Sequence, residues 1–570
     1  MIEIEKIIRD SITSALGGLN LPTTDFTIEH PDDLTRGDYA TNVALMLGKE
    51  TKKNPMEIAE KIADKLKVAP LESLKVRPWL ERVEVVAPGF LNFFLTPEFF
   101  TSEMSLIIAQ GDKYGEGITE RSKRVMIEYT DPNPFKEFHI GHLMSNTIGE
   151  AISRLVASQG AEVKRACYQG DVGLHVAKAI WGRLKLKTQN AKEIEEWGKA
   201  YTLGSKAYEN DEATRQEIVD FNKKIYERSD KSINDLYDAG KKVSLDYFET
   251  IYRRLGTKFD FYFFESESGQ FGKKLVEENV VKVFEKSDGA MVFKGEKYNL
   301  HTRVFINADD LPTYEAKELG LAKIKYDRYP YDQSIVITGN EVKDYFRVLL
   351  KALELISPAL AEKTLHLTHG MLRLPTGKMS SRVGNVVTAE SLLDEVKSVV
   401  KLKIAERDFT LGEQEAMVEA VAVAAIKYSI LKQAPGRNII FDLGRSVSLE
   451  GDSGPYLQYA YVRAQAVLAK ANAENIQVDP EIPPAEISDL ERRLGRFPEV
   501  VARATRLYAP NLLVTYLTEL AASFNTYYAT QKIVDAGDPH APYRLATTLA
   551  FSHLMKSGLT LLAIPTPERM

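Results

Sequence analysis

Apolar and polar positions follow three different patterns along the 570 residues of this chain. Residues 1–112 begin with helical spacing, and Val83–Leu95 then predicts a strand, a turn and a second strand. Residues 113–400 combine short strand-like runs with helices, and the charged stretch 184–255 within them predicts a helical insertion. Residues 401–570 keep helical spacing nearly to the end. We therefore predict a multidomain chain with an N-terminal α+β domain, an α/β core and an all-α C-terminal domain.

One segment of the core predicts a strand, a tight turn and a helix. Val125–Tyr129 is rich in strand formers, Thr130–Pro134 contains two prolines that break the run, and helical spacing starts near Gly141. His139 and His142 then lie near the helix N-terminus, where free backbone N–H groups and the helix dipole favour phosphate. Gly141 allows a flat base to approach the backbone. A histidine pair that only caps the helix is the alternative.

A second segment of interest follows more than 200 residues later. Leu365–Leu374 is an apolar run that Pro375–Gly377 ends. Lys378 then offers a compact positive charge on a flexible stem, which suits a leaving pyrophosphate. Ser380 and Ser381 add hydroxyl donors. An ordinary solvated loop is the alternative.

These two motifs, His139-Ile-Gly-His142 and Gly377-Lys-Met-Ser-Ser381, resemble in order and separation the signature of class I aminoacyl-tRNA synthetases. Further segments resemble the arginyl members of that class: Gly37–Ala44, Pro88–Phe93, Gly384–Val396, Gly454–Arg463 and Pro567–Met570. The resemblance therefore covers almost the whole chain.

The resemblance implies a Rossmann-type catalytic core in residues 113–400, a domain that binds the tRNA elbow in residues 1–112 and a helical-bundle anticodon-binding domain in residues 401–570. It implies ATP-dependent activation of L-arginine and transfer to the 3′ end of arginine tRNA, with Mg²⁺ accompanying ATP. Another class I synthetase and a non-catalytic tRNA-binding relative remain alternatives. The intact histidine pair and Lys378 argue against the second.

The expected chemistry needs no protein nucleophile, because the arginine carboxylate is already ionised. We expect positioning and charge stabilisation by His139, His142, Lys378 and Lys136. Lys136 either shares the stabilisation of pyrophosphate with Lys378 or only steadies its loop. The expected ATP-binding residues are His139, Gly141, His142, Lys378, Met379, Ser380 and Ser381.

A pocket for arginine needs carboxylates or amides, because a guanidinium carries five donors and no acceptor. Tyr314 and Glu318 are four residues apart on a predicted helix and share a face. Many relatives carry aspartate where Glu318 stands. Asp171 and His175 follow a strand and either order the substrate or stabilise a turn. By resemblance, the arginine-binding positions are Glu128, Asn133, Tyr314, Glu318 and Glu341.

Contacts with tRNA are expected from both ends of the chain. Aromatic rings beside arginine suit unstacked anticodon bases, although the same helical spacing permits core packing. Arg492, Arg496 and Arg503 are spaced as one basic helical face, or as a solvated one. The expected tRNA-binding residues are Asn92, Phe93, Tyr456, Tyr459, Arg463, Tyr528 and Met570.

Composition changes this picture little. A net charge of −6 is compatible with tRNA binding, because local basic faces bind nucleic acid. The single cysteine, Cys167, excludes a disulfide framework and a multi-cysteine zinc site, so we expect no structural zinc. The N-terminus has no signal-peptide pattern, and no apolar run approaches the roughly 20 residues that span a bilayer. We expect a cytoplasmic monomer with no membrane partner.

Overall fold

The computed structural model of the protein describes residues 4–31, 33–68, 79–186, 193–373, 387–404, 409–481 and 486–570. The chain forms two compact units, which are described separately. The terminal unit comprises Met1–Tyr114, Ala460–Glu499 and Glu519–Ser557. The core unit comprises Gly115–Tyr459, Val500–Thr518 and Gly558–Met570. Among the described residues, no helix has the length and apolar character required to cross a bilayer.

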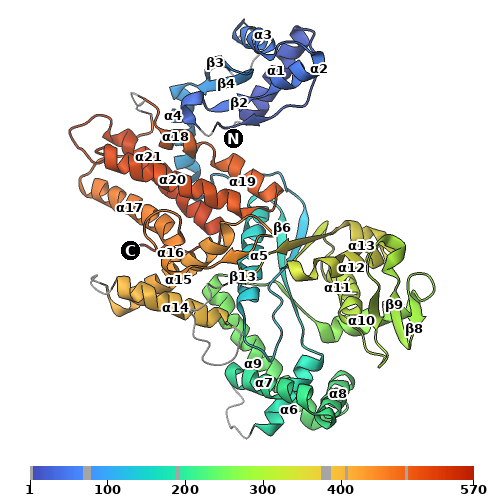
Figure 1. Ribbon diagram of the computed structural model, residues 1–570. Coiled ribbons are helices and arrows are strands. Elements are labelled where there is room, and N and C mark those ends of the chain that lie inside the picture. Colours follow the sequence, from blue (N-terminus) through green and yellow to red (C-terminus); the bar gives the residue numbers. More distant parts are fainter. Residues whose placement is uncertain are drawn as a thin grey trace. The chain divides into compact units, whose positions relative to one another are not determined.

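The core unit contains a five-stranded sheet in which every neighbouring pair of strands is parallel (Figure 1). The strand order is β12-β11-β5-β6-β7. From β5 the chain continues to β6 and β7 on one side, whereas β11 and β12 lie on the other side of β5. Open α/β sheets bind ligands at such a switch point, which here lies between β5 and β11. The strands are β5 (Arg124–Glu128), β6 (Glu162–Gln169), β7 (Phe261–Phe264), β11 (Gln333–Gly339) and β12 (Thr364–His369).

Strand β5 is the apolar run predicted from the sequence. Val125, Met126 and Ile127 are all completely buried, as expected for a parallel strand covered on both faces. Helix α5 (Ile140–Ser158) follows the predicted turn. Cys167 in β6 is buried.

The predicted helical insertion is confirmed as helices α7 (Ile194–Asn210), α8 (Glu212–Glu227) and α9 (Lys231–Leu255), which pack with the preceding α6 (Leu174–Lys185). Two glycines allow α6 and α7 to approach closely. A Cβ atom on Gly182 would lie 2.0 Å from the carbonyl oxygen of Ala200, and one on Gly204 would lie 2.0 Å from that of Lys178.

A second excursion from the core, which the sequence patterns did not predict, contains a three-stranded antiparallel sheet. Its strands have only three or four residues, too few to show a clear alternation. Their packing includes Phe284, Phe293 and Phe305. The elements of this part are α10 (Glu265–Glu278), β8 (Glu285–Ser287), β9 (Ala290–Phe293), η3 (Gly295–Tyr298), β10 (Arg303–Ile306) and α11 (Tyr314–Arg328).

The rest of the core unit is mainly helical. A short parallel pair, β13 with β14, interrupts the helices. The remaining elements are η4 (Asn340–Val342), α12 (Lys343–Ile356), α13 (Pro358–Glu362), β13 (Leu372–Arg373), α14 (Ala389–Lys403), α15 (Leu411–Leu431), β14 (Ile439–Ile440) and α16 (Leu443–Ser446).

The terminal unit contains a four-stranded antiparallel sheet of order β1-β2-β4-β3. Its last hairpin, β3 to β4, confirms the strand–turn–strand prediction. Ile8, Leu47 and Leu91 are among its buried core residues. Its N-terminal elements are α1 (Ile4–Gly18), β1 (Ile28–Glu29), η1 (Leu34–Arg36), β2 (Tyr39–Thr41), α2 (Val43–Thr51), α3 (Pro55–Val68), β3 (Leu80–Val86), β4 (Phe90–Leu95), α4 (Pro97–Gln110) and η2 (Gly111–Lys113).

The C-terminal part of the chain is helical, as predicted. Four of its helices have residues in both units: α17 (Gly454–Ala473), α19 (Phe497–Arg506), α20 (Pro510–Thr530) and α21 (Ala541–Leu561). The single basic face predicted for Arg492, Arg496 and Arg503 is wrong, because α18 (Asp489–Leu494) ends before α19 begins. Arg492 instead forms an ion pair with Asp38 inside the terminal unit.

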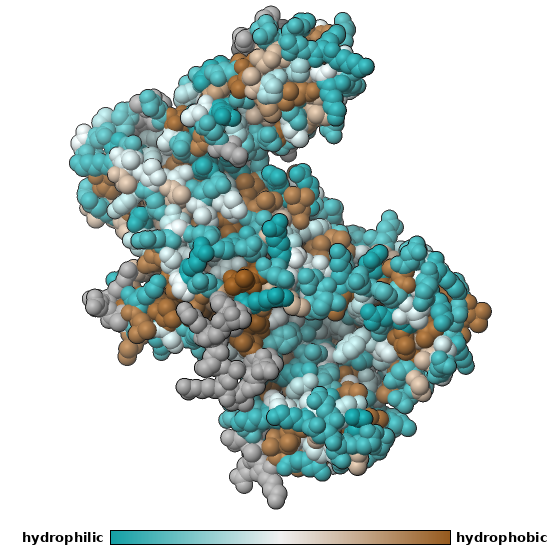
Figure 2. Space-filling view, viewed as in Figure 1, coloured by the Kyte–Doolittle hydropathy of each residue, from teal (hydrophilic) through white to brown (hydrophobic). Residues whose placement is uncertain are grey.

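The face shown in Figure 2 is mostly hydrophilic, with apolar side chains gathered in small separate patches. Such scattered apolar residues are normal for a folded surface.

Gly182→Ala should lower the thermal midpoint of unfolding, because the new methyl group would overlap the backbone of α7. Overpacking of this kind costs about 1–3 kcal/mol. Gly412→Ala in α15 is the matched control, since a Cβ there meets nothing within 4 Å, and it should leave the midpoint unchanged or raise it. Equal midpoints for Gly182→Ala and the unmodified protein, measured by calorimetry, would contradict the close packing of α6 and α7.

Candidate active site

The turn between β5 and α5 has an unusual backbone. Thr130, Asp131 and Phe135 have φ angles of 84°, 47° and 68°, in the left-handed region that non-glycine residues rarely adopt. The Thr130 N–H donates to Ser145 Oγ at 2.9 Å, and Asn146 Nδ2 donates to Thr130 Oγ1 at 3.0 Å. The first turns of α5 thus hold a strained segment in place, as is common at functional sites.

The histidine pair forms the N-terminus of α5. The Gly141 N–H donates to His139 Nδ1 at 3.1 Å, and the His139 N–H donates to His142 Nδ1 at 3.4 Å. The two imidazole rings stack with centroids 3.5 Å apart. Because each Nδ1 accepts a hydrogen bond, the proton of each neutral ring lies on Nε2. Both rings therefore have an Nε2–H donor left for a ligand.

Both histidines favour the neutral form. Burial lowers the pKa of His139, and the Lys136 ammonium lowers it further. Burial lowers the pKa of His142 well below its usual range, with added repulsion from His139 and Lys136. Two neutral donors at a helix N-terminus suit a phosphate, since the helix supplies favourable partial charge. A Cβ on Gly141 would lie 2.9 Å from His139 Cε1, so only glycine leaves the ring in this position.

Of the two lysines predicted for catalysis, only Lys136 lies within the described residues. Lys136 is half-buried, and its Nζ lies 4.2 Å from the centroid of the Tyr201 ring. Lys378 lies outside the described residues, as do the rest of its motif: Met379, Ser380 and Ser381.

An acidic cluster lies at the carboxyl end of β5. Glu128 is buried and forms an ion pair of 2.7 Å with the buried Lys325, so this carboxylate already has a cationic partner. Glu318 is half-buried and has no hydrogen-bond or ion-pair partner in the described part of the chain. Burial and the Glu128 carboxylate raise the pKa of Glu318 well above its usual range, and they do the same for Asp131. A guanidinium would relieve this repulsion and favour the ionised forms.

The other predicted pocket residues lie in different surroundings. The Asn133 side chain lies against Gly170, where a Cβ atom would come within 2.3 Å of its Oδ1. Tyr314 opens α11 and is 60% exposed. Glu341 is exposed and acts to raise the pKa of His139, which opposes the effect of burial.

Sequence reasoning missed two polar groups of this region. The Tyr345 hydroxyl and Gln169 Oε1 are buried and have no hydrogen-bond partner among the described residues. Burial and the Glu318 carboxylate raise the pKa of Tyr345 well above its usual range. A buried polar group without a partner needs an explanation, and a bound ligand is one. Gln169 ends β6, just before the turn predicted at Asp171 and His175, and no sequence signal indicated Tyr345.

Asp171 has a structural role. It is completely buried and accepts hydrogen bonds from Tyr237 Oη at 2.8 Å, Lys241 Nζ at 2.7 Å, and the N–H and Oγ of Ser266 at 2.9 and 2.7 Å. These partners come from α9 and α10. Asp171 therefore joins the end of β6 to two helices, which favours the structural alternative for this residue.

The ring N–H of His175 is also used in a hydrogen bond within the protein. Its Nε2 lies 2.8 Å from the carbonyl oxygen of Gly170, to which it donates. Burial lowers the pKa of His175 to about 3, so the ring is neutral near pH 7. It stabilises the turn that carries Asp171.

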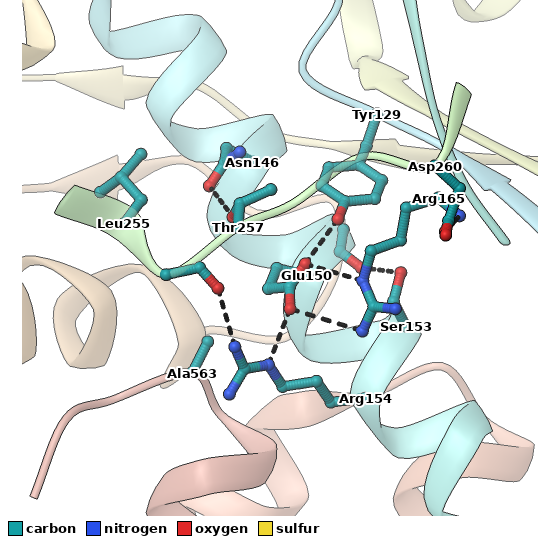
Figure 3. A network of polar contacts seen from close by, with 12 residues as sticks. Tyr129, Asn146, Glu150, Ser153, Arg154, Arg165, Leu255, Thr257, Asp260 and Ala563 are labelled. Atoms are coloured by element: carbon teal, nitrogen blue, oxygen red, sulfur yellow. Dashed lines mark hydrogen bonds and ion pairs between the residues drawn. The ribbon is translucent and has the colours of Figure 1, made fainter. Parts of the chain in front are cut away.

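The polar network in Figure 3 connects helix α5 to the neighbouring strands. Glu150 accepts from Tyr129 Oη at 2.6 Å, and it pairs with Arg165 at 3.0 Å and with Arg154 at 2.7 Å. Arg165 lies on β6 and Tyr129 directly follows β5, so the network joins two strands to the helix that carries the histidines.

Arg154 extends this network beyond the sheet. It donates to the carbonyl oxygens of Gly256 and Thr560, both at 2.8 Å. Lys427 is completely buried and donates to the carbonyl oxygens of Leu255 and Ala563, at 2.6 and 2.8 Å. Arg154 of α5 and Lys427 of α15 thereby hold the C-terminal ends of α9 and α21.

The two N-terminal residues predicted to contact tRNA are buried. Asn92 is 4% exposed and Phe93 is 1% exposed, and Phe93 belongs to the core of the terminal unit. In this conformation neither offers a surface to tRNA.

The C-terminal candidates divide into packed and exposed residues. Tyr456 and Tyr459 are half-buried on α17, and Met570 packs against the core. Tyr528 is 45% exposed, and the guanidinium carbon of Arg463 lies 5.0 Å from its ring centroid. This aromatic–arginine pair has the chemistry of a base-stacking platform.

Comparison with known proteins decides which family this geometry represents. The family model described as tRNA synthetases class I (R), catalytic domain, matches residues 103–443. The Arginyl tRNA synthetase N terminal domain matches residues 3–95, and the DALR anticodon binding domain matches residues 457–570. The chain belongs to the arginyl-tRNA synthetase family.

Relatives in this family match over full length. The arginine–tRNA ligase of Clostridium perfringens is 29% identical, with 100% of both chains covered. That of Lactobacillus delbrueckii subsp. bulgaricus is 30% identical, with 99% of this chain and 100% of the relative covered. The Thermus thermophilus arginyl-tRNA synthetase structure has a TM-score of 0.75 at 25% identity over 100% of both chains. The predicted fold class, with its parallel-sheet class I core, is confirmed.

Replacing His142 with asparagine should weaken the dependence of stability on pH. His142 is neutral in the folded state, whereas an unfolded histidine titrates near pH 6.5. Below that pH the unfolded state binds a proton that the folded state does not, so stability falls as pH falls. Each unit of pKa difference is worth about 1.4 kcal/mol.

The measurement is thermal unfolding of the unmodified protein and His142→Asn between about pH 7.5 and 5.5. Asparagine keeps an acceptor for the His139 N–H but does not titrate. A midpoint that falls equally in both proteins would show that the imidazole is not held neutral.

Proposed function

We propose that this chain is an active arginine–tRNA ligase that activates L-arginine with ATP and transfers it to the 3′ end of arginine tRNA. The observation that carries the proposal is the half-buried Glu318 carboxylate without a partner, in an acidic cluster of the same catalytic unit as the histidine pair. Family membership supplies the reaction class.

The first step joins the arginine carboxylate to the α-phosphorus of ATP and expels pyrophosphate. The Nε2–H groups of His139 and His142 donate to phosphate oxygens at the start of α5, and Lys136 and Lys378 supply positive charge for the leaving group. Gly141 keeps this surface open, and Met379, Ser380 and Ser381 complete the nucleotide site. ATP enters as its magnesium complex. Among the residues that the structure describes, no cluster of three or more acidic, histidine or cysteine side chains could hold the ion.

The arginine side chain enters the acidic cluster. Its guanidinium donates to Glu318, while the Tyr345 hydroxyl and Gln169 Oε1 accept further N–H groups. Glu128 adds negative charge beside Glu318, which its ion pair with Lys325 partly offsets. Asn133, Tyr314 and Glu341 line the approach for the amino-acid backbone.

In the second step a ribose hydroxyl at the tRNA 3′ end attacks the carbonyl carbon of arginyl-adenylate, the acyl–phosphate bond breaks, and AMP leaves. Arg463 and Tyr528 stack on unpaired bases of the anticodon loop, and Tyr456, Tyr459 and Met570 also contact the tRNA. The protein acts as a cytoplasmic monomer. Its elbow-binding, catalytic and anticodon-binding domains extend over residues 1–112, 113–400 and 401–570.

Glu318→Gln should raise the arginine KM by about 10- to 100-fold, because a hydrogen bond to a charged group contributes about 1.5–3 kcal/mol. The KM for ATP should change little. Both constants come from ATP–pyrophosphate exchange in the presence of tRNA. Asp327→Asn, a surface carboxylate paired with Lys323 on the same helix, is the control and should leave both constants unchanged. Normal arginine kinetics in Glu318→Gln would remove Glu318 from the pocket.

Tyr345→Phe should raise the arginine KM by about 3- to 10-fold, the effect of one lost hydrogen bond. The free energy of unfolding should not fall, because the hydroxyl has no partner without substrate. Tyr298→Phe, at a 39% exposed ring, serves as the control. An unchanged arginine KM together with lower stability would assign the hydroxyl a purely structural role.

A further inference from the structure

Three consecutive residues of the strained turn contact one helix of the insertion. The Phe135 ring packs against Trp197 with centroids 5.2 Å apart. Lys136 Nζ lies 4.2 Å from the ring centroid of Tyr201. The Glu137 carboxylate lies against Gly198, where a Cβ atom would be 3.5 Å from its Oε2. Helix α7 therefore contacts the segment directly before His139.

The aromatic residues that receive Phe135 and Lys136 are spaced by one helical turn. Trp197 and Tyr201 are four residues apart in α7 and share a face. Trp197 is completely buried, whereas Tyr201 is half-buried at the edge of the site. Helix α7 thus places the buried Trp197 side chain one turn before the Tyr201 ring, whose face can bind a cation.

Several interactions fix the turn and this helix. The Phe135 N–H donates to Ser244 Oγ of α9 at 2.8 Å, and a Cβ on Gly240 would lie 2.4 Å from the Phe135 ring. The glycine contacts between α6 and α7 set the distance of α7 from the core. The Tyr201 ring consequently has little freedom to move relative to Lys136.

The Lys136 ammonium faces the catalytic residues. Its charge contributes to the lowered pKa values of His139, His142 and His175, each of which is lowered first by burial. Burial alone would raise the pKa of Tyr201, but the nearby Lys136 lowers it. One cation is therefore close to both the histidine pair and the Tyr201 ring.

We propose that Tyr201 is a positioning residue that holds the Lys136 ammonium toward the phosphates of ATP. This inference rests on the proposed function of the site. A lysine side chain has many rotamers, and a ring face that attracts its ammonium selects a few of them. The Lys136 ammonium contacts the Tyr201 ring face and also forms a hydrogen bond with the Tyr201 side chain. Phenylalanine keeps only the ring face, so it should preserve part of the positioning, whereas leucine should preserve none.

The experiment is a double-mutant cycle with Tyr201→Leu and Lys136→Met, in ATP–pyrophosphate exchange with tRNA present. Tyr201→Leu should lower kcat by about 10-fold, within the range of a partly desolvated cation–π contact, with the arginine KM unchanged. Tyr201→Phe, which keeps the ring face, should lose less activity than Tyr201→Leu. In the Lys136→Met background, Tyr201→Leu should cause no further loss.

The matched control uses a second lysine–tyrosine contact of α7. Lys178 Nζ of α6 lies 4.1 Å from the ring centroid of Tyr208 on α7. Tyr208→Leu should leave kcat unchanged. Equal losses from Tyr201→Leu in both backgrounds, or the same loss from Tyr208→Leu, would overturn the inference.

A second readout separates this inference from the proposed function. In protein labelled with fluorotyrosine, the fluorine resonance lost in Tyr201→Phe identifies Tyr201, and Lys136→Met should shift it. An unmoved resonance would overturn the contact whatever the enzyme activates. Exchange of the unmodified protein with each of the twenty amino acids tests the function itself, and the cycle is run with the amino acid that is activated.

Discussion

The active site depends on one constraint, the left-handed backbone of the turn between β5 and α5. Such a conformation costs free energy at non-glycine residues and persists only where surrounding contacts compensate. Phe135 is held by α7 and α9, and Thr130 is held by the first turns of α5. The turn in this shape brings His139 to the N-cap position, where its Nδ1 is occupied and its Nε2–H is left for phosphate.

The same constraint explains why the charged insertion belongs to the catalytic unit. Its helices have a separate apolar cluster, yet Phe135 is one of the buried members of that cluster. Asp171 adds a polar connection between the core sheet and α9. Further along α5, the Glu150 network joins the helix to β5 and β6. The histidines are therefore positioned by elements that lie far apart in the sequence.

The sequence predicted local features well, because local physics determines them. Two prolines ended the β5 run, and helical spacing placed the start of α5 near His139. The pattern also found the α/β core, the insertion and the helical C-terminal part. Its failures concern side chains whose partners are distant. Nothing near Glu128 indicates that Lys325 pairs with it, and Phe93 shows its burial only after β2 and β3 pack beside β4. The unpartnered Tyr345 hydroxyl depends equally on tertiary packing.

The most direct test of this account is aminoacylation of unfractionated tRNA with each of the twenty amino acids. Charged tRNAs, protected from periodate at their 3′ ends, are then sequenced. The account predicts that arginine is attached far more efficiently than any other amino acid and that the protected tRNAs carry arginine anticodons. Efficient attachment of a different amino acid, or no charged tRNA with arginine and ATP both present, would contradict it.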